Sequence, residues 1–339
     1  MGRPSVEVPD LCRATWELIR QVPAGQVTTY RAVAQALGDE LASRAVGRIV
    51  AEADPSSSLP THRVVHSDGR VGGDGADAAS ERLQAEGVPV REGRVVGVRD
   101  SLFADFATDA PLKRLQALQD ELAAHVDRTL SISRIETVAG VDLSYRGNWR
   151  GVGAYVRMDA EGERVQATMT IEQTTPFPYI PTYLAFRELP VLLALLDAVR
   201  DRSQMADVVL VDGTGLLHHR HVGIASHLGV VMDVPTVGVT KRLLYGTVET
   251  DGMAVREVRW VMDSDRPEQR LGAAIKTSAR AHPIYVSVGH RVDLDTAVDL
   301  VLASSSRKLP EPIRRADALS REAAREPTPA STRQQALDL

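Results

Sequence analysis

The sequence predicts two domains, a mainly α-helical domain followed by an α/β domain. The chain has 339 residues, which is enough to bury two separate hydrophobic cores. Short amphipathic helical patterns broken by turn sequences fill the first hundred residues, whereas strand-like runs alternate with helices from residue 137 onward. We place the domains at residues 1–105 and 106–320. A tail over 321–339, rich in Arg, Glu, Pro, Ser and Thr, is expected to be disordered.

The first domain is expected to contain four helices and a hairpin. Helical patterns occupy residues 10–22, 41–53 and 77–87, and a hairpin is expected around Glu92 and Gly93. Thr28 or Thr29 can cap another helix, which Gly38 ends. Two short helices joined by a tight turn, with Arg44 at the start of the second, indicate a helix-turn-helix arrangement.

The second domain begins with a leucine-spaced helix over residues 110–130. The expected strands span residues 137–145, 151–158, 165–171, 207–212 and 236–240, and the expected helices span 187–200 and 221–231. The β-branched run that ends at Asp212 is typical of a strand buried on both faces. These elements predict an α/β sheet.

Composition excludes several classes of protein. Cys12 is the only cysteine, so neither an internal disulfide nor a thiolate zinc site can form. The formal net charge of -5 means that any affinity for nucleic acid has to come from local basic patches. No apolar run approaches the ~20 residues of a membrane span, and no signal peptide is visible. We therefore expect a soluble cytoplasmic protein that does not bind membranes.

Three carboxylates stand out in the second domain. Asp142 lies within an apolar strand, Glu188 near the start of a helix, and Asp212 at the end of a strand. Three acidic side chains in apolar surroundings are costly to gather unless a cation neutralises them. Hard oxygen ligands favour Mg²⁺, with Mn²⁺ as an alternative.

Three ordered strings mark the first domain: VPAGQVTTY at 22–30, SRAVG at 43–47 and PTHRVV at 60–65. Across roughly residues 8–100 they resemble the winged-helix-like DNA-binding domain of alkylguanine-DNA alkyltransferases. The resemblance places Thr61 where that family carries the thiol that accepts the alkyl group. A thiol titrates near pH ~8.5, whereas a threonine hydroxyl does not ionise so easily. The domain thus resembles the alkyltransferase-like proteins, which recognise the lesion without repairing it.

The same resemblance implies DNA-contacting roles for several residues. Arg44 would enter the base stack and replace the rotated-out nucleotide, and Tyr30 would press on the phosphate 3′ to it. Base rotation costs a few kcal/mol, which such a cation partly offsets. Thr61, His62 and Arg63 would lie at the lesion. His62 and Glu86 match the pair that relays a proton in true transferases, and without the thiol a structural hydrogen bond between them is the alternative.

A second set of strings runs through the α/β domain. They are PYIP at 178–181, AFRE at 185–188, VDG at 211–213, GIASHLG at 223–229, GVTK at 238–241, VGHR at 288–291 and LPEP at 309–312. Over about residues 112–320 they resemble endonuclease V, which implies a ribonuclease H-like fold. The resemblance assigns the metal to Asp142, Glu188 and Asp212, the attacking water to His290, the phosphate to Lys241, and a base-opening wedge to Pro178, Tyr179, Ile180 and Pro181.

The two resemblances together imply a DNA-repair endonuclease fused to a lesion reader. It would hydrolyse the second phosphodiester 3′ to deoxyinosine with Mg²⁺, and its first domain would bind alkylguanine without alkyl transfer. Two alternatives stay open: a non-catalytic lesion-recognition protein that recruits other repair factors, and an endonuclease for inosine in RNA. Damaged DNA is the expected partner, which would associate the protein with the nucleoid. The C-terminal hexapeptide from Gln334 to Leu339 also resembles a sliding-clamp docking motif.

Overall fold

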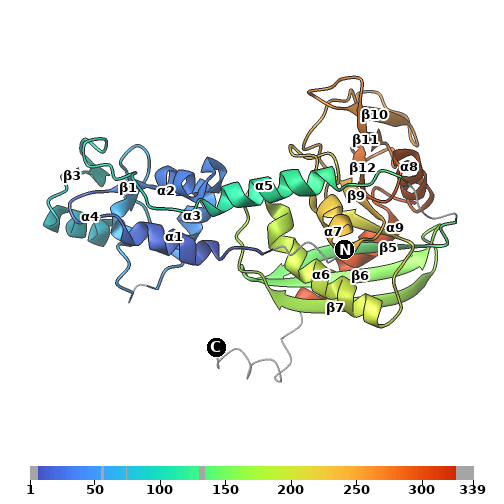
Figure 1. Cartoon of the computed structure of the whole chain (residues 1–339), viewed down its shortest axis with the longest axis horizontal. Coiled ribbons are helices and arrows are strands. Elements are labelled where there is room, and N and C mark those ends of the chain that lie inside the picture. The colour runs from blue at the N-terminus through green and yellow to red at the C-terminus, as the bar shows by residue number, and fades with distance from the viewer. Residues whose placement is uncertain (1–6, 55–56, 74, 130–133, 326–339) are drawn as a thin grey trace. The chain divides into compact units, whose positions relative to one another are not determined.

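The computed structural model describes residues 7–54, 57–73, 75–129 and 134–325 (Figure 1). They separate into two compact units. The helical unit contains the described residues up to Leu118 together with Pro176–Leu184, and the sheet unit contains residues 119–175 and the chain from Ala185 onward.

The helical unit is built from short elements. They are α1 (Leu11–Arg20), β1 (Thr28–Thr29), α2 (Tyr30–Leu37), η1 (Glu40–Ala42), α3 (Ser43–Ala51), η2 (Thr61–Arg63), β2 (Val64–Val65), α4 (Ala76–Ala85), β3 (Val90–Arg91) and β4 (Arg94–Val95). The Thr29 hydroxyl accepts a hydrogen bond from Ala32 N at 3.0 Å and so caps α2. Gly38 ends that helix at φ 113°. Both capping predictions and the hairpin around Glu92 are confirmed, whereas the winged-helix arrangement stays a prediction.

The segment after residue 105 belongs to the helical unit, although we expected it to begin the second domain. Gln21 and Ala107 exchange two hydrogen bonds, at 2.8 and 2.9 Å, and the Thr108 hydroxyl donates to Ala36 O at 2.9 Å. These contacts hold the segment against α1 and α2. Helix α5 (Pro111–Ala124) then runs from the helical unit into the sheet unit.

The sheet unit contains an eight-stranded sheet in the order β10-β11-β12-β9-β8-β5-β6-β7. The strands are β5 (Thr137–Arg146), β6 (Arg150–Asp159), β7 (Val165–Thr174), β8 (Val208–Asp212), β9 (Thr236–Thr240), β10 (Val258–Met262), β11 (Arg270–Ile275) and β12 (Ile284–His290). β5, β8 and β9 pair in parallel, and the other neighbours pair antiparallel. The predicted α/β sheet is confirmed. We assigned no element between residues 241 and 320, where three of these strands lie.

Four helices pack around the sheet: α6 (Leu184–Asp201), α7 (Ile224–Met232), α8 (Leu294–Ala303) and α9 (Glu311–Arg325). A Cβ at Gly140 of β5 would overlap the backbone of Pro312 in α9, whereas Cβ atoms at Gly151 and Gly153 of β6 would touch Val191 of α6. Gly140 pairs with Val156, an odd number of residues from Gly151 and Gly153. Because successive residues of a strand point to opposite faces, α9 and α6 cover opposite faces of the sheet. Asp142, two residues after Gly140, therefore points to the α9 face.

Helix α9 corrects the expected tail. It continues to Arg325, five residues into the segment that we expected to be disordered from residue 321. The Arg146 guanidinium of β5 donates to the carbonyls of Ala323 and Ala324, at 2.7 and 3.2 Å, which fixes this last turn to the sheet. The sequence Gln334–Leu339 lies outside the described residues, so the clamp motif stays a prediction.

Among the residues that the structure describes, no helix is long and apolar enough to cross a bilayer.

Replacement of Gly140 by alanine is expected to destabilise the sheet unit by about 1–3 kcal/mol, because the new methyl group would force α9 away from β5. Scanning calorimetry measures the loss as a lower Tm. Gly75→Ala is the matched control, since a Cβ there meets nothing within 4 Å. Equal Tm values for the two variants would contradict the close packing of α9.

Candidate functional site

Two aspartates lie side by side on neighbouring parallel strands. β5 and β8 pair in the register Gly140↔Leu210 and Val141↔Val211. Asp142 and Asp212 are the next residues on each strand, and Asp212 is the last residue of β8. Side chains at corresponding positions of paired strands lie on the same face of a sheet. The fold therefore brings together two carboxylates that are 70 residues apart in the sequence.

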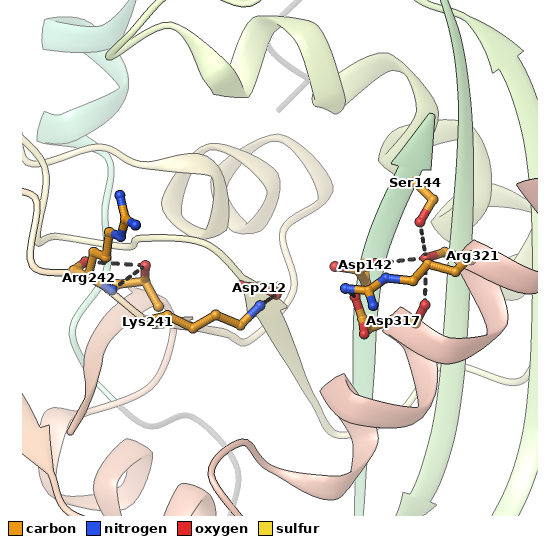
Figure 2. Close-up of polar contacts among 9 residues, drawn as sticks. Asp142, Ser144, Asp212, Lys241, Arg242, Asp317 and Arg321 are labelled. Atoms are coloured by element: carbon orange, nitrogen blue, oxygen red, sulfur yellow. Dashed lines mark hydrogen bonds and ion pairs between the residues drawn. The ribbon is translucent and has the colours of Figure 1, made fainter. Parts of the chain in front are cut away.

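Helix α9 contributes polar groups beside Asp142 (Figure 2). The Ser320 hydroxyl lies 2.7 Å from Asp142 Oδ2 and 2.8 Å from the hydroxyl of Ser144, the next residue of β5 that points to this face. Asp317, one turn earlier in α9, is held by Arg321 at 2.7 Å. Asp317 contributes to the repulsion that raises the Asp142 pKa, so it is a fourth carboxylate at the site.

Lys241 neutralises part of this charge. It follows β9 directly, and its Nζ lies 2.8 Å from Asp212 Oδ2 (Figure 2). The Asp212 carboxylate is mostly buried, with 18% of its side chain exposed, while Lys241 is 43% exposed. Lys241 is thus the nearest described source of positive charge for Asp212, and it reaches the site from the solvent side.

Two carboxyls of the cluster, Asp142 and Glu188, have raised pKa values. Burial, followed by repulsion from Asp142 and Asp212, raises the pKa of Glu188 to about 8. Burial is also the main cause that raises the pKa of Asp142 to about 7, with repulsion from Asp212 and Asp317 adding to it and the Ser320 hydroxyl opposing it. Asp142 and Glu188 therefore resist ionisation until a positive charge enters.

The cluster fits a hard divalent cation in its chemistry. Its donors are carboxylate oxygens, as Mg²⁺ and Mn²⁺ prefer. In the part of the chain that the structure describes, however, no three His, Cys, Asp or Glu side chains converge closely enough to coordinate one ion. Asp212 is turned toward the Lys241 ammonium, which supplies the charge that a cation would supply.

His290 contacts Asp127 and Asp233 and none of the clustered carboxylates. It is the last residue of β12 and 6% exposed, its Nδ1 accepts from Asp127 N at 3.1 Å, and its Nε2 lies 3.6 Å from Asp233 Oδ1. Burial lowers its pKa, which favours the neutral ring that these contacts require. The described contacts of His290 hold neighbouring segments in place and do not include Asp142, Glu188 or Asp212, and its assignment to the attacking water stays a prediction.

Asp317 and Ser320 were missed by the sequence reasoning. They lie in a strongly charged stretch, and nothing in its composition separates Asp317 from the surrounding surface charges. The available signal was the helical spacing of buried Ile313, Ala316 and Ser320, which fixes one face of α9 against the sheet. That face is the one that presents Ser320 to Asp142.

Around Thr61 the structure forms a charged triad. Glu86 binds His62 Nε2 at 3.0 Å and receives both Nε and Nη2 of Arg63, at 2.8 and 2.6 Å. The Arg63 guanidinium is the main cause that lowers the Glu86 pKa to about 2. Arg63 also donates to Val22 O at 2.7 Å. All three of these donor groups have partners within the unit, so Arg63 has a structural role there, and its contact with DNA stays a prediction.

The other expected DNA contacts have different settings. Arg44, the second residue of α3, is exposed, and no partner is described for it within the described ranges. Tyr30 is half-buried at the start of α2, with its ring 5.2 Å from that of His66. In the segment 178–181, Tyr179 is 56% exposed whereas Ile180 is fully buried. Arg44 and Tyr179 are therefore open to a ligand, and Tyr30 is partly so.

Acidic residues gathered on an α/β sheet, joined to a unit with a helix-turn-helix pattern, define a nuclease with its own DNA-binding module. Comparison with known proteins gives the family. Residues 120–318 match the profile of endonuclease V, and residues 10–88 match the DNA-binding domain of 6-O-methylguanine DNA methyltransferase. The chain belongs to the endonuclease V family, as a fusion with an alkyltransferase-type DNA-binding domain, and is a DNA-repair endonuclease.

Relatives support both halves of this assignment. The chain is 31% identical to a bifunctional methyltransferase/endonuclease of Picrophilus torridus over 89% of this chain and 93% of the relative. The catalytic domain of human endonuclease V is similar with a TM-score of 0.60 and 34% identity, over 65% of this chain and 98% of that one. Endonuclease V of Ciona intestinalis, solved with a 24mer DNA containing an inosine followed by a ribo-adenosine, gives a TM-score of 0.58 and 27% identity, over 63% and 98%.

The raised carboxyl pKa values predict how the stability of the metal-free protein depends on pH. Asp142 and Glu188 bind protons more tightly when folded, at pKa values of about 7 and 8, than at their ordinary values of 3.8 and 4.5. Their protonation therefore stabilises the fold at low pH, and this contribution is lost as pH rises through the folded pKa values. We expect Tm to fall by roughly 5 °C between about pH 5.5 and pH 8.

The control is the Asp142→Asn/Glu188→Gln double variant, which lacks both titrating groups. Its Tm should change less over the same range, and Mg²⁺ at pH 8 should raise Tm in the wild type only. The same slope in both proteins would show that these carboxyls are not the source.

Proposed function

We propose that this protein nicks DNA at the second phosphodiester 3′ to deoxyinosine with Mg²⁺ or Mn²⁺ as cofactor, and that its helical unit binds alkylguanine lesions without transferring the alkyl group. The observation that carries the nuclease half is the cluster of Asp142, Asp212 and Glu188, three partly buried carboxyls that repel one another. Such an arrangement is costly unless a cation enters it.

The residues divide the chemistry between them. Asp142, Asp212 and Glu188 would hold the cation, which supplies Lewis-acid charge and lowers the pKa of water when bound. Ser320 orients the Asp142 carboxylate by its 2.7 Å hydrogen bond. Lys241, once released from Asp212, would bind a phosphate oxygen and steady its negative charge.

Support for the deoxyinosine substrate comes from the Ciona relative, which was solved with inosine-containing DNA. Within this chain the exposed Tyr179 ring, flanked by Pro178 and Pro181, suits stacking where a base pair has opened. The anchored neighbour Ile180 keeps this loop in place during stacking.

Support for recognition without repair comes from the lack of a reactive thiol among the described residues of the helical unit. Thr61 offers a hydroxyl at the acceptor position. Cys12 is the only cysteine, and burial raises its pKa to about 11, so it is not a thiolate near neutral pH. The His62–Glu86 pair consequently acts with Arg63 as a structural contact.

Asp142→Ala is expected to abolish nicking of a deoxyinosine duplex in Mg²⁺. The loss should reach at least a hundredfold in rate, about 2.7 kcal/mol, because a ligand oxygen at the centre of the cluster disappears. A gel assay on a labelled 30-mer measures it, with the exposed loop residue Asp251 mutated to alanine as control. If the wild-type protein leaves the duplex intact in Mg²⁺ and Mn²⁺, the proposed activity is wrong.

Arg44→Ala is expected to weaken binding to an O6-methylguanine duplex by roughly tenfold, about 1.4 kcal/mol, since the side chain that fills the base stack is removed. Fluorescence anisotropy with and without the lesion measures this. Arg91→Ala, an exposed arginine of β3, is the matched control. No radiolabelled methyl group should appear on the wild-type protein, and a labelled protein would contradict recognition without transfer.

A further inference from the structure

A buried tyrosine ties the proposed wedge to the rest of the helical unit. Tyr183 lies two residues after Pro181 and is 1% exposed. Its hydroxyl donates to Asp39 Oδ2 at 2.7 Å and accepts from Gln116 Nε2 at 2.6 Å. Gln116 Nε2 also lies 3.1 Å from the same Asp39 oxygen. These three polar groups form a closed network within one compact unit.

Asp39 connects this network to helix α3, which carries Arg44. Its other oxygen, Oδ1, accepts from Leu41 N at 2.9 Å and so caps η1. Helix α3, which carries Arg44, begins at Ser43, directly after η1 ends at Ala42. One carboxylate therefore holds both the start of the segment that leads into α3 and Tyr183, two residues after the wedge.

The residue that directly follows the wedge is strained. Thr182 adopts φ 69°, a left-handed conformation that a β-branched residue rarely takes. Such strain persists where the neighbouring structure determines the backbone. Ile180 on one side is fully buried and Tyr183 on the other is hydrogen-bonded, while Tyr179 is left 56% exposed. The loop is thus anchored at both sides of the strain and presents one aromatic ring.

We propose that Asp39 and Tyr183 are positioning residues that couple the Tyr179 wedge to the lesion-reading helix α3. Base opening at deoxyinosine and reading of alkylguanine would then share one rigid element, although only the wedge belongs to the endonuclease V sequence. This inference rests on the proposed function, because it takes Tyr179 as the residue that opens the base pair.

The test is Tyr183→Phe in the full chain, which removes one hydroxyl and keeps the buried ring. A 2-aminopurine placed next to deoxyinosine reports base opening on binding without added metal, and nicking in Mg²⁺ is measured on the same duplex. We expect both to fall roughly tenfold, the equivalent of about 1.4 kcal/mol. On a substrate whose deoxyinosine lies in an unpaired bubble, nicking should change less than about twofold, since no pair has to be opened.

Matched variants separate positioning from loss of stability. Tyr155→Phe removes a comparable buried hydroxyl, which donates to Gln204 O at 2.8 Å in the sheet unit, and should leave base opening unchanged. Asp39→Asn keeps an oxygen acceptor and should retain more base opening than Asp39→Ala. Wild-type base opening in Tyr183→Phe, or an equal loss of nicking on duplex and bubble, would overturn the inference. Absence of nicking by the wild type would instead reject the proposed function, and the fluorescence signal would still decide the role of Tyr183.

Discussion

Repulsion among buried carboxylates is the constraint on which the site depends. Asp142 and Asp212 occupy corresponding positions of paired parallel strands, and Glu188 from α6 adds to their field. The fold accepts this cost by three means: partial protonation, the Ser320 hydroxyl, and the Lys241 ammonium. Protonation, the Ser320 hydrogen bond and the Lys241 ion pair are each reversible, so a cation can replace them in neutralising the carboxylates.

Helix α9 shows how distant sequence serves this constraint. Its register against β5 is set where Gly140 admits the backbone of Pro312, and it continues until Arg146 binds its last carbonyls. Between these two contacts lie Asp317 and Ser320, the groups that modify Asp142. A packing contact of the sheet thereby sets the electrostatics of the acidic site.

In the helical unit the opposite charges are paired with each other. Its charged residues Arg63 and Glu86 satisfy each other and so stabilise the segment after Thr61, whereas Arg44 is exposed and Tyr30 half-buried. Thr61, which carries a hydroxyl and no thiol, lies within this scaffold of hydrogen bonds. The junction at Asp39 adds an element of the nuclease sequence to the same scaffold.

Sequence patterns were sufficient for many of the local elements, and they singled out Asp142 and Asp212, which the sheet places side by side. The caps at Thr29 and Gly38, the strand that ends at Asp212 and the family strings are encoded within short windows, where propensity and periodicity act. The tertiary structure decided that Asp317 and Ser320 join Asp142, that Arg63 pairs inward, and that His290 contacts Asp127. Each of these depends on residues more than 20 positions apart, whose approach is set by strand register and helix packing rather than by any local pattern.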